Sequence, residues 1–140
     1  METEDLRIGN YVFGIHEDDI LTRTYVPSKV LALDSTGTAE CNILVESLLK
    51  SSVEFYHYFE PIPLTEGWFL KFGFEFYETE KSKVYRLDGF LITYVVQGRF
   101  KGKKYLKFHS VTFENFGHIQ SVHQLQNLYF ALTNKELKTK

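Results

Sequence analysis

Cysteine, proline, methionine and tryptophan are all scarce in this 140-residue chain, which contains one Cys, three Pro, one Met and one Trp. The single cysteine, Cys41, excludes an internal disulfide and any metal site built from several cysteines. The longest apolar run, residues 90–96, is far short of the roughly 20 residues that span a bilayer. The acidic start METEDLR has no apolar stretch behind it, so we expect no signal peptide. These absences predict a cytoplasmic protein without membrane contact.

Aromatic residues, by contrast, are abundant. Thirteen Phe and nine Tyr suit strands and sheet faces better than helical bundles. The net charge of −2 hides an asymmetry, because residues 1–60 hold eleven acidic against four basic side chains, whereas residues 61–140 hold seven against twelve. A basic second half can meet nucleic acid, and opposite poles can attract each other within one chain or between copies. The solvated faces of an ordinary fold would give the same distribution.

The first 60 residues predict a small barrel-like antiparallel β module of SH3-like size. Gly9 and Asn10 form a turn-prone pair inside an apolar run, and residues 16–20, HEDDI, are typical of an acidic loop. A second turn is expected at residues 34–37. The expected strands are residues 25–33, 38–45 and 53–59.

Residues 121–137 contain the clearest helical pattern in the chain. Apolar residues recur there at three- and four-residue spacing. Ser121 and Gln124 have the spacing of a capping box, and Asn134 tolerates a left-handed stop. The apolar stripe consists of Val122, Leu125, Leu128, Tyr129 and Leu132.

A second, shorter helix is expected at residues 65–72, capped by Thr65 and ended by Gly73. A β-meander should follow, with a turn at Asp88 and Gly89. Its expected strands are residues 74–77, 84–87, 90–97 and 103–110. The predicted fold class is α+β, with a β module at residues 1–60 packed with a meander that carries both helices at residues 61–140, or one compact domain.

Three blocks of sequence resemble a group of small proteins of unassigned function encoded by Bacteroidetes and by their phages and mobile elements. The blocks read LRIGNYV, PIPLTEGWFLKFGF and VHQLQNLYFALTNKEL. This chain has Gly67 where the group commonly has glutamate, Phe69 in place of leucine and Asn134 in place of glycine. The resemblance implies a phage or mobile-element protein in a bacterial host cell. It carries over no catalytic residue.

Candidates for catalysis or metal binding are few. The five histidines have no helical i, i+4 pair of the kind that binds zinc in HExxH motifs, so they are read as surface or structural residues. Cys41 is expected to be a small apolar strand residue, and the acidic cluster Glu17, Asp18 and Asp19 lacks the spacing of a calcium loop. No phosphate-binding or dinucleotide-binding glycine motif and no nucleophile elbow occurs. We expect no cofactor and no metal, and favour a non-enzymatic role.

The segment RFKGKKYLKF is the strongest functional signal. Its basic side chains crowd an expected hairpin tip and Tyr94, Phe100 and Tyr105 lie near them, as in a ribbon that binds single-stranded nucleic acid. Lysines at strand edges also prevent sheets from aggregating, which is the alternative reading. The candidate nucleic-acid-binding residues are Arg99, Lys101, Lys103, Lys104 and Tyr105.

Three classes of function therefore remain open. A non-enzymatic interaction protein, a phage accessory factor that acts through protein–protein contacts or self-assembly, is favoured by the lack of catalytic motifs and by the many aromatics. A nucleic-acid-binding module would use the basic tip. A small-ligand-binding protein or enzyme would use an aromatic pocket with convergent polar groups.

Overall fold

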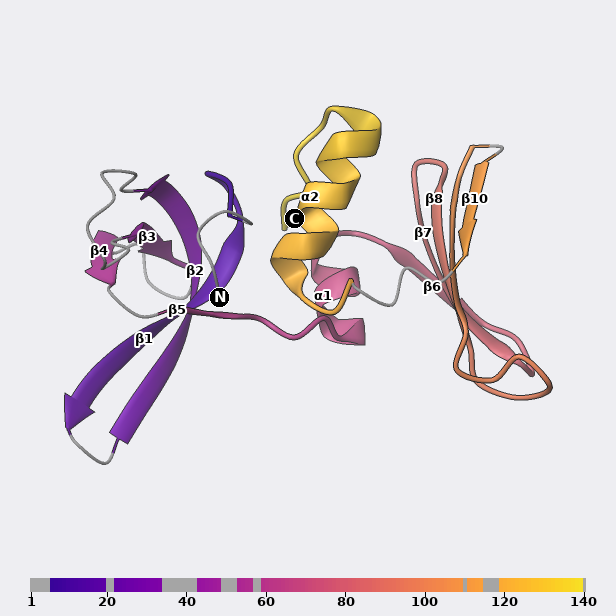
Figure 1. The fold of residues 1–140 in the computed structure, drawn as a ribbon, viewed down its shortest axis with the longest axis horizontal. Helices are drawn as coiled ribbons and strands as arrows, with labels where there is room; N and C mark the ends of the chain where they lie inside the picture. The colour runs from indigo at the N-terminus through magenta and orange to yellow at the C-terminus, as the bar shows by residue number, and fades with distance from the viewer. Residues whose placement is uncertain are drawn as a thin grey trace. The chain divides into compact units, whose positions relative to one another are not determined.

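The computed structural model describes residues 6–19, 22–33, 43–48, 53–56, 59–109, 111–114 and 119–139. These residues form two five-stranded antiparallel sheets and two helices (Figure 1). The α+β class expected from the sequence is thereby confirmed. The chain divides into two compact units: unit 1 contains the described residues up to Pro63 together with Ser121–Glu136, and unit 2 contains Leu64–Gln120 and the described residues from Leu137.

Unit 1 contains a curled sheet with the strand order β4-β3-β2-β1-β5. Strand β1 lies between β2 and β5, and it also contacts β4 at the far edge of the same sheet. A strand reaches the opposite edge of its own sheet only when the sheet curls strongly, so this sheet is barrel-like, as expected. The strands are β1 (Tyr11–Asp19), β2 (Thr22–Leu33), β3 (Ile43–Ser47), β4 (Val53–Tyr56) and β5 (Phe59–Pro61).

Irregular pairing accounts for part of the curl. The β1–β2 register shifts between Glu17 and Asp19, and the β2–β3 register shifts between Val30 and Ala32. Such bulges bend a strand and increase its twist. The expected acidic loop at residues 16–20 is wrong for residues 16–19, because β1 continues through them and pairs with β2. Backbone pairing with a neighbouring strand here outweighs the low strand propensity of acidic residues.

The expected turn at Gly9 and Asn10 is present. Gly9 has a φ of 96°, which its lack of a side chain permits. The Gly9 N–H donates to the Val30 carbonyl at 2.8 Å, and the Val30 N–H donates to the Asn10 carbonyl at 2.8 Å. The turn is therefore joined to β2. The second expected turn, at residues 34–37, lies outside the described residues.

Unit 2 contains the expected β-meander, in which strands β6 to β10 pair in sequence order. The turn between β7 and β8 is at Asp88 and Gly89, as predicted, and both residues have positive φ values. The sequence interpretation lacked the last strand, β10. The strands are β6 (Glu75–Glu78), β7 (Ser82–Leu87), β8 (Phe90–Val95), β9 (Lys104–Phe108) and β10 (Val111–Glu114).

Helix α1 (Glu66–Lys71) lies over one face of this sheet through Phe69. The Phe69 ring stacks on Tyr85 of β7 with the ring centroids 4.1 Å apart. Gly73, with a φ of 91°, follows the helix as expected. Thr65 is the N-cap residue, as predicted. Its side chain makes no capping hydrogen bond, so the predicted capping interaction is wrong.

Helix α2 (Val122–Thr133) begins and ends as predicted. The Ser121 N–H donates to the Gln124 side-chain oxygen at 3.2 Å, and Asn134 has a left-handed φ of 57°. The expectation that α2 packs on the meander is wrong. The helix belongs to unit 1 and contacts β1. The Tyr11 N–H donates to the side-chain oxygen of Gln126 at 2.7 Å. A polar residue within the helix, which the apolar stripe does not reveal, thus links α2 to the first sheet.

Candidate anion-binding site

The loop between β8 and β9 carries most of the cations that the sequence singled out. Its backbone is closed by hydrogen bonds from the Val95 N–H to the Lys103 carbonyl at 2.9 Å and from the Gly102 N–H to the Val95 carbonyl at 2.8 Å. The Lys103 N–H also donates to the Phe100 carbonyl at 3.0 Å. These backbone hydrogen bonds define the conformation of the loop. The side chains of Arg99, Phe100, Lys101 and Lys103 are exposed on it.

Phe100 lies in this loop within cation–π distance of two cations. Its side chain is 51% exposed, so part of the ring is open to solvent. The Lys103 ammonium lies 5.2 Å from the ring centroid, and the Arg99 guanidinium lies 5.9 Å from it. These contacts are cation–π interactions that hold positive charge beside an exposed aromatic face.

The same end of the sheet gathers further positive charge. Lys81, in the β6–β7 connection, lies beside this loop, since its carbonyl accepts a hydrogen bond from the Val96 N–H at 2.7 Å. Lys101 is exposed at the loop tip. In the described part of the chain, ion pairs join Arg7 to Glu136 and Arg86 to Glu75, and none involves the cations of this loop. Their charge remains directed to solvent.

The five residues that the sequence grouped do not share one surface. Lys104 pairs with Tyr94 across β8 and β9, whereas Tyr105 pairs with Thr93. Because consecutive strand side chains point to opposite faces, Lys104 lies on the face that carries α1 and Tyr105 lies on the other face. Arg99, Lys101 and Lys103 all lie in the loop between β8 and β9. The structure thus separates Tyr105 from Lys104 within the predicted group.

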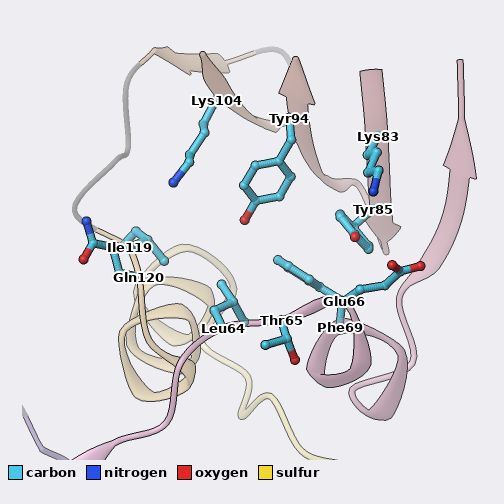
Figure 2. A pocket seen from close by; sticks show the side chains of 10 residues that line it. All are labelled: Leu64, Thr65, Glu66, Phe69, Lys83, Tyr85, Tyr94, Lys104, Ile119 and Gln120. Carbon is cyan, nitrogen blue, oxygen red and sulfur yellow. The ribbon is translucent and has the colours of Figure 1, made fainter. Parts of the chain in front are cut away.

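A pocket of about 370 Å³ lies on the α1 face beside Lys104 (Figure 2). Its apolar lining includes Leu64, Phe69 and Ile119, and its polar lining includes Thr65 and Gln120. All of these residues belong to unit 2. The volume is at the lower end of the range of roughly 300–1,000 Å³ for small-molecule pockets.

Charged and phenolic side chains complete the pocket. Lys83, Lys104 and Glu66 supply two positive charges and one negative charge, and Tyr85 and Tyr94 supply phenols. Burial, and to a smaller extent the neighbouring Tyr85, raises the pKa of Tyr94 to about 12. Tyr94 therefore keeps its proton at neutral pH and can donate a hydrogen bond. Burial also raises the pKa of Tyr85, helped by the negative charges of Glu66 and of Glu78 on β6.

Sequence reasoning missed Lys83 as a site residue. A usable signal existed in the alternation of residues 82–87, which places Lys83 and Tyr85 on one face of a strand. That face lines a pocket because α1 and residues 119–120 lie against it. A local sequence pattern does not predict which face of a sheet a helix will cover.

The other candidate groups do not assemble into a reactive site among the described residues. His123 is buried, and its Nδ1 lies 3.0 Å from the Ser121 hydroxyl. His57, His118 and Cys41 lie outside the described residues, and the side chains of His16, Glu17, Asp18 and Asp19 are likewise not described. In the described ranges, no group of three histidine, cysteine or acidic side chains is placed to hold a metal ion. No described helix has the length and apolar character needed to cross a membrane.

Comparisons of the chain with family models, with curated proteins and with solved structures found no match.

Proposed function

We propose that this protein is a non-enzymatic binding protein, a phage or mobile-element accessory factor, and that it binds single-stranded nucleic acid with the β8–β9 loop. The observation that carries the proposal is the exposed Phe100 ring, which the cations of both Arg99 and Lys103 contact. Aromatic rings stack on bases without regard to sequence, and cations neutralise phosphates. An exposed ring with two cations near it provides both contacts in one loop.

The exposed aromatic ring favours single strands over duplex DNA as the partner. Arg99, Lys101 and Lys103 belong to one loop, and the backbone of Lys81 lies beside it. Base stacking on Phe100 requires unpaired bases, which a duplex does not offer. Each phosphate neutralised by a cation makes binding more sensitive to salt, with a slope of roughly −0.7 per contact for single strands.

Fluorescence anisotropy with a labelled oligothymidylate at low salt tests this proposal. The double variant Lys101→Glu/Lys103→Glu should weaken binding at least about tenfold and flatten the salt dependence, because two phosphate contacts become repulsive. Phe100→Ala should weaken binding with little change of the salt slope, by about 1–3 kcal/mol. The matched control, Lys135→Glu/Lys138→Glu, makes the same change of net charge at residues outside the loop and should bind almost as wild type.

Equal losses in the loop variant and the control variant would show that binding depends on net charge alone and would contradict the proposal.

The second candidate function is protein–protein contact or self-association, which the residue composition favours. Edge strand β10 supports it, because Val111 and Phe113 are 52% and 41% exposed. Light scattering should in that case reveal an oligomer that Phe113→Lys dissociates.

A further inference from the structure

The pocket beside Lys104 is lined by none of Arg99, Lys101 and Lys103. The geometry points to a small molecule that carries a carboxylate or phosphate on a flat apolar body as its ligand. The Lys104 ammonium and the Tyr94 hydroxyl receive the anionic group, and the Phe69 side of the pocket receives the body. This ligand class goes beyond the nucleic-acid proposal, since the pocket uses side chains that the loop does not.

The anion position is set by two donors from neighbouring strands. Figure 2 shows the Lys104 ammonium and the Tyr94 hydroxyl directed into the same space. Lys104 Nζ lies 5.6 Å from the centroid of the Tyr94 ring, and no ion pair engages it in the described part of the chain. An ammonium and a phenol that keeps its proton are both donors, so a carboxylate or phosphate can accept from both at once.

The remaining wall of the pocket is suited to a flat apolar group. Phe69 is held in place by stacking on Tyr85, and its ring also packs edge-on against Tyr94 with centroids 6.2 Å apart. Leu64 and Ile119 add aliphatic surface. Rings fixed by their neighbours lose little freedom when a ligand docks, which favours binding of a planar body.

Glu66 orients the ligand. Its carboxylate lies on the Tyr85 side of the pocket, where its charge acts on the Tyr85 hydroxyl (Figure 2). Lys83 lies on this same side of the pocket (Figure 2). Among the described lining residues the Lys104 side has no carboxylate, and the anionic group is therefore directed to Lys104.

Isothermal titration calorimetry with phenyl phosphate, benzoate, inorganic phosphate and benzyl alcohol tests the inference. Phenyl phosphate or benzoate should bind in the millimolar range or tighter, and inorganic phosphate and benzyl alcohol should each bind more weakly, because each lacks one half of the ligand. The comparison of phenyl phosphate with benzoate decides which anionic group the site prefers. No binding of either aromatic anion would overturn the inference.

Three variants with opposite expected effects sharpen the test. Lys104→Gln should weaken binding of the aromatic anion about tenfold or more, Tyr94→Phe should weaken it less, and Glu66→Gln should strengthen it several-fold by removing a like charge. Lys107→Gln is the matched control, because Lys107 lies on the same strand and faces away from the pocket. Equal effects of Lys104→Gln and Lys107→Gln would contradict the site.

The pocket and the loop can fail separately. Lys101→Glu/Lys103→Glu should leave binding of phenyl phosphate within about twofold of wild type, since neither residue lines the pocket. The fold of each variant is checked by its amide NMR spectrum, so that loss of binding is assigned to the site. A loop variant that abolishes phenyl phosphate binding while it stays folded would place the anion at the loop and overturn the pocket.

Discussion

Tyr94 shows how its surroundings change the chemistry of one side chain. An exposed tyrosine has a pKa of about 10, whereas burial raises the pKa of Tyr94 to about 12. The cause is desolvation, which disfavours the phenolate, and the nearby Tyr85 adds to it. A hydroxyl with a pKa this high keeps its proton and remains a hydrogen-bond donor throughout the physiological pH range.

The raised pKa makes stability depend on alkaline pH. Between about pH 10 and 12 the unfolded chain releases the Tyr94 proton while the folded protein keeps it, so the unfolded state binds fewer protons. The free energy of unfolding should therefore fall as pH rises through this window, by at most about 1.4 kcal/mol per pH unit from this residue. Below pH 10 this contribution does not change with pH.

Urea unfolding of wild type and Tyr94→Phe across that window checks the prediction. Phenylalanine has no proton to lose, so the variant should lose less stability than wild type as pH rises. Tyr77→Phe, at an exposed tyrosine on β6, is the control. Parallel pH profiles for wild type and Tyr94→Phe would show that Tyr94 ionises alike in both states and would refute the assignment.

Two glycines in unit 2 illustrate how element geometry decides the effect of one substitution. Gly89 lies in the β7–β8 turn with a φ of 80°, and an added Cβ would meet no atom closer than 3.5 Å. Gly67 lies in α1, and an added Cβ there would meet only the Thr65 hydroxyl at 3.7 Å. Space is adequate at both positions, so backbone conformation is the difference between them.

Alanine should therefore have opposite effects at these two sites. Gly89→Ala should lower the free energy of unfolding by about 1–2 kcal/mol, because an L-residue is strained at positive φ. Gly67→Ala should raise it by up to about 1 kcal/mol, because alanine favours the helix. Thermal unfolding of both variants measures the two signs. A gain of stability for Gly89→Ala would show that the turn relaxes to another type.

At the scale of elements, local sequence signals predicted most of the structure. Ser121 and Asn134 mark the ends of α2, Gly73 follows α1, and Asp88 with Gly89 marks a hairpin, because each signal acts within a few residues. The failures have non-local causes. Residues 16–19 form a strand because β2 pairs with them, and β10 forms because β9 offers an edge.

At the scale of the whole molecule, unit 1 is built from segments far apart in the sequence. Gln126 is fully buried on α2, where its side-chain oxygen accepts from the Tyr11 N–H at 2.7 Å and its nitrogen donates to the Gly9 carbonyl at 3.2 Å. Arg7 donates to the Asn127 side-chain oxygen at 2.8 Å. One polar face of the helix thus satisfies the backbone of the Gly9 turn.

Removal of the Gln126 amide should destabilise this unit. Gln126→Leu keeps the volume nearly constant but leaves the buried Tyr11 N–H without its acceptor, which costs about 1–3 kcal/mol. Urea unfolding gives the free energy, and faster hydrogen exchange at the Tyr11 amide gives the local signature. Gln97→Leu, at an exposed glutamine, should change neither. Unchanged exchange at Tyr11 would show that another group takes over as acceptor.

The amino-acid sequence was enough to predict the α+β class, the ends of both helices, four of the five meander strands and the basic loop, because periodicity, caps and turn residues act over short distances. Tertiary structure decided which sheet α2 joins, through Gln126 and the Gly9 turn, and it directed Lys104 into a pocket while Tyr105 faces away. The reason is physical. Consecutive side chains of a strand point to opposite faces of the sheet. Only packing between distant segments decides which face is covered and which side chains meet.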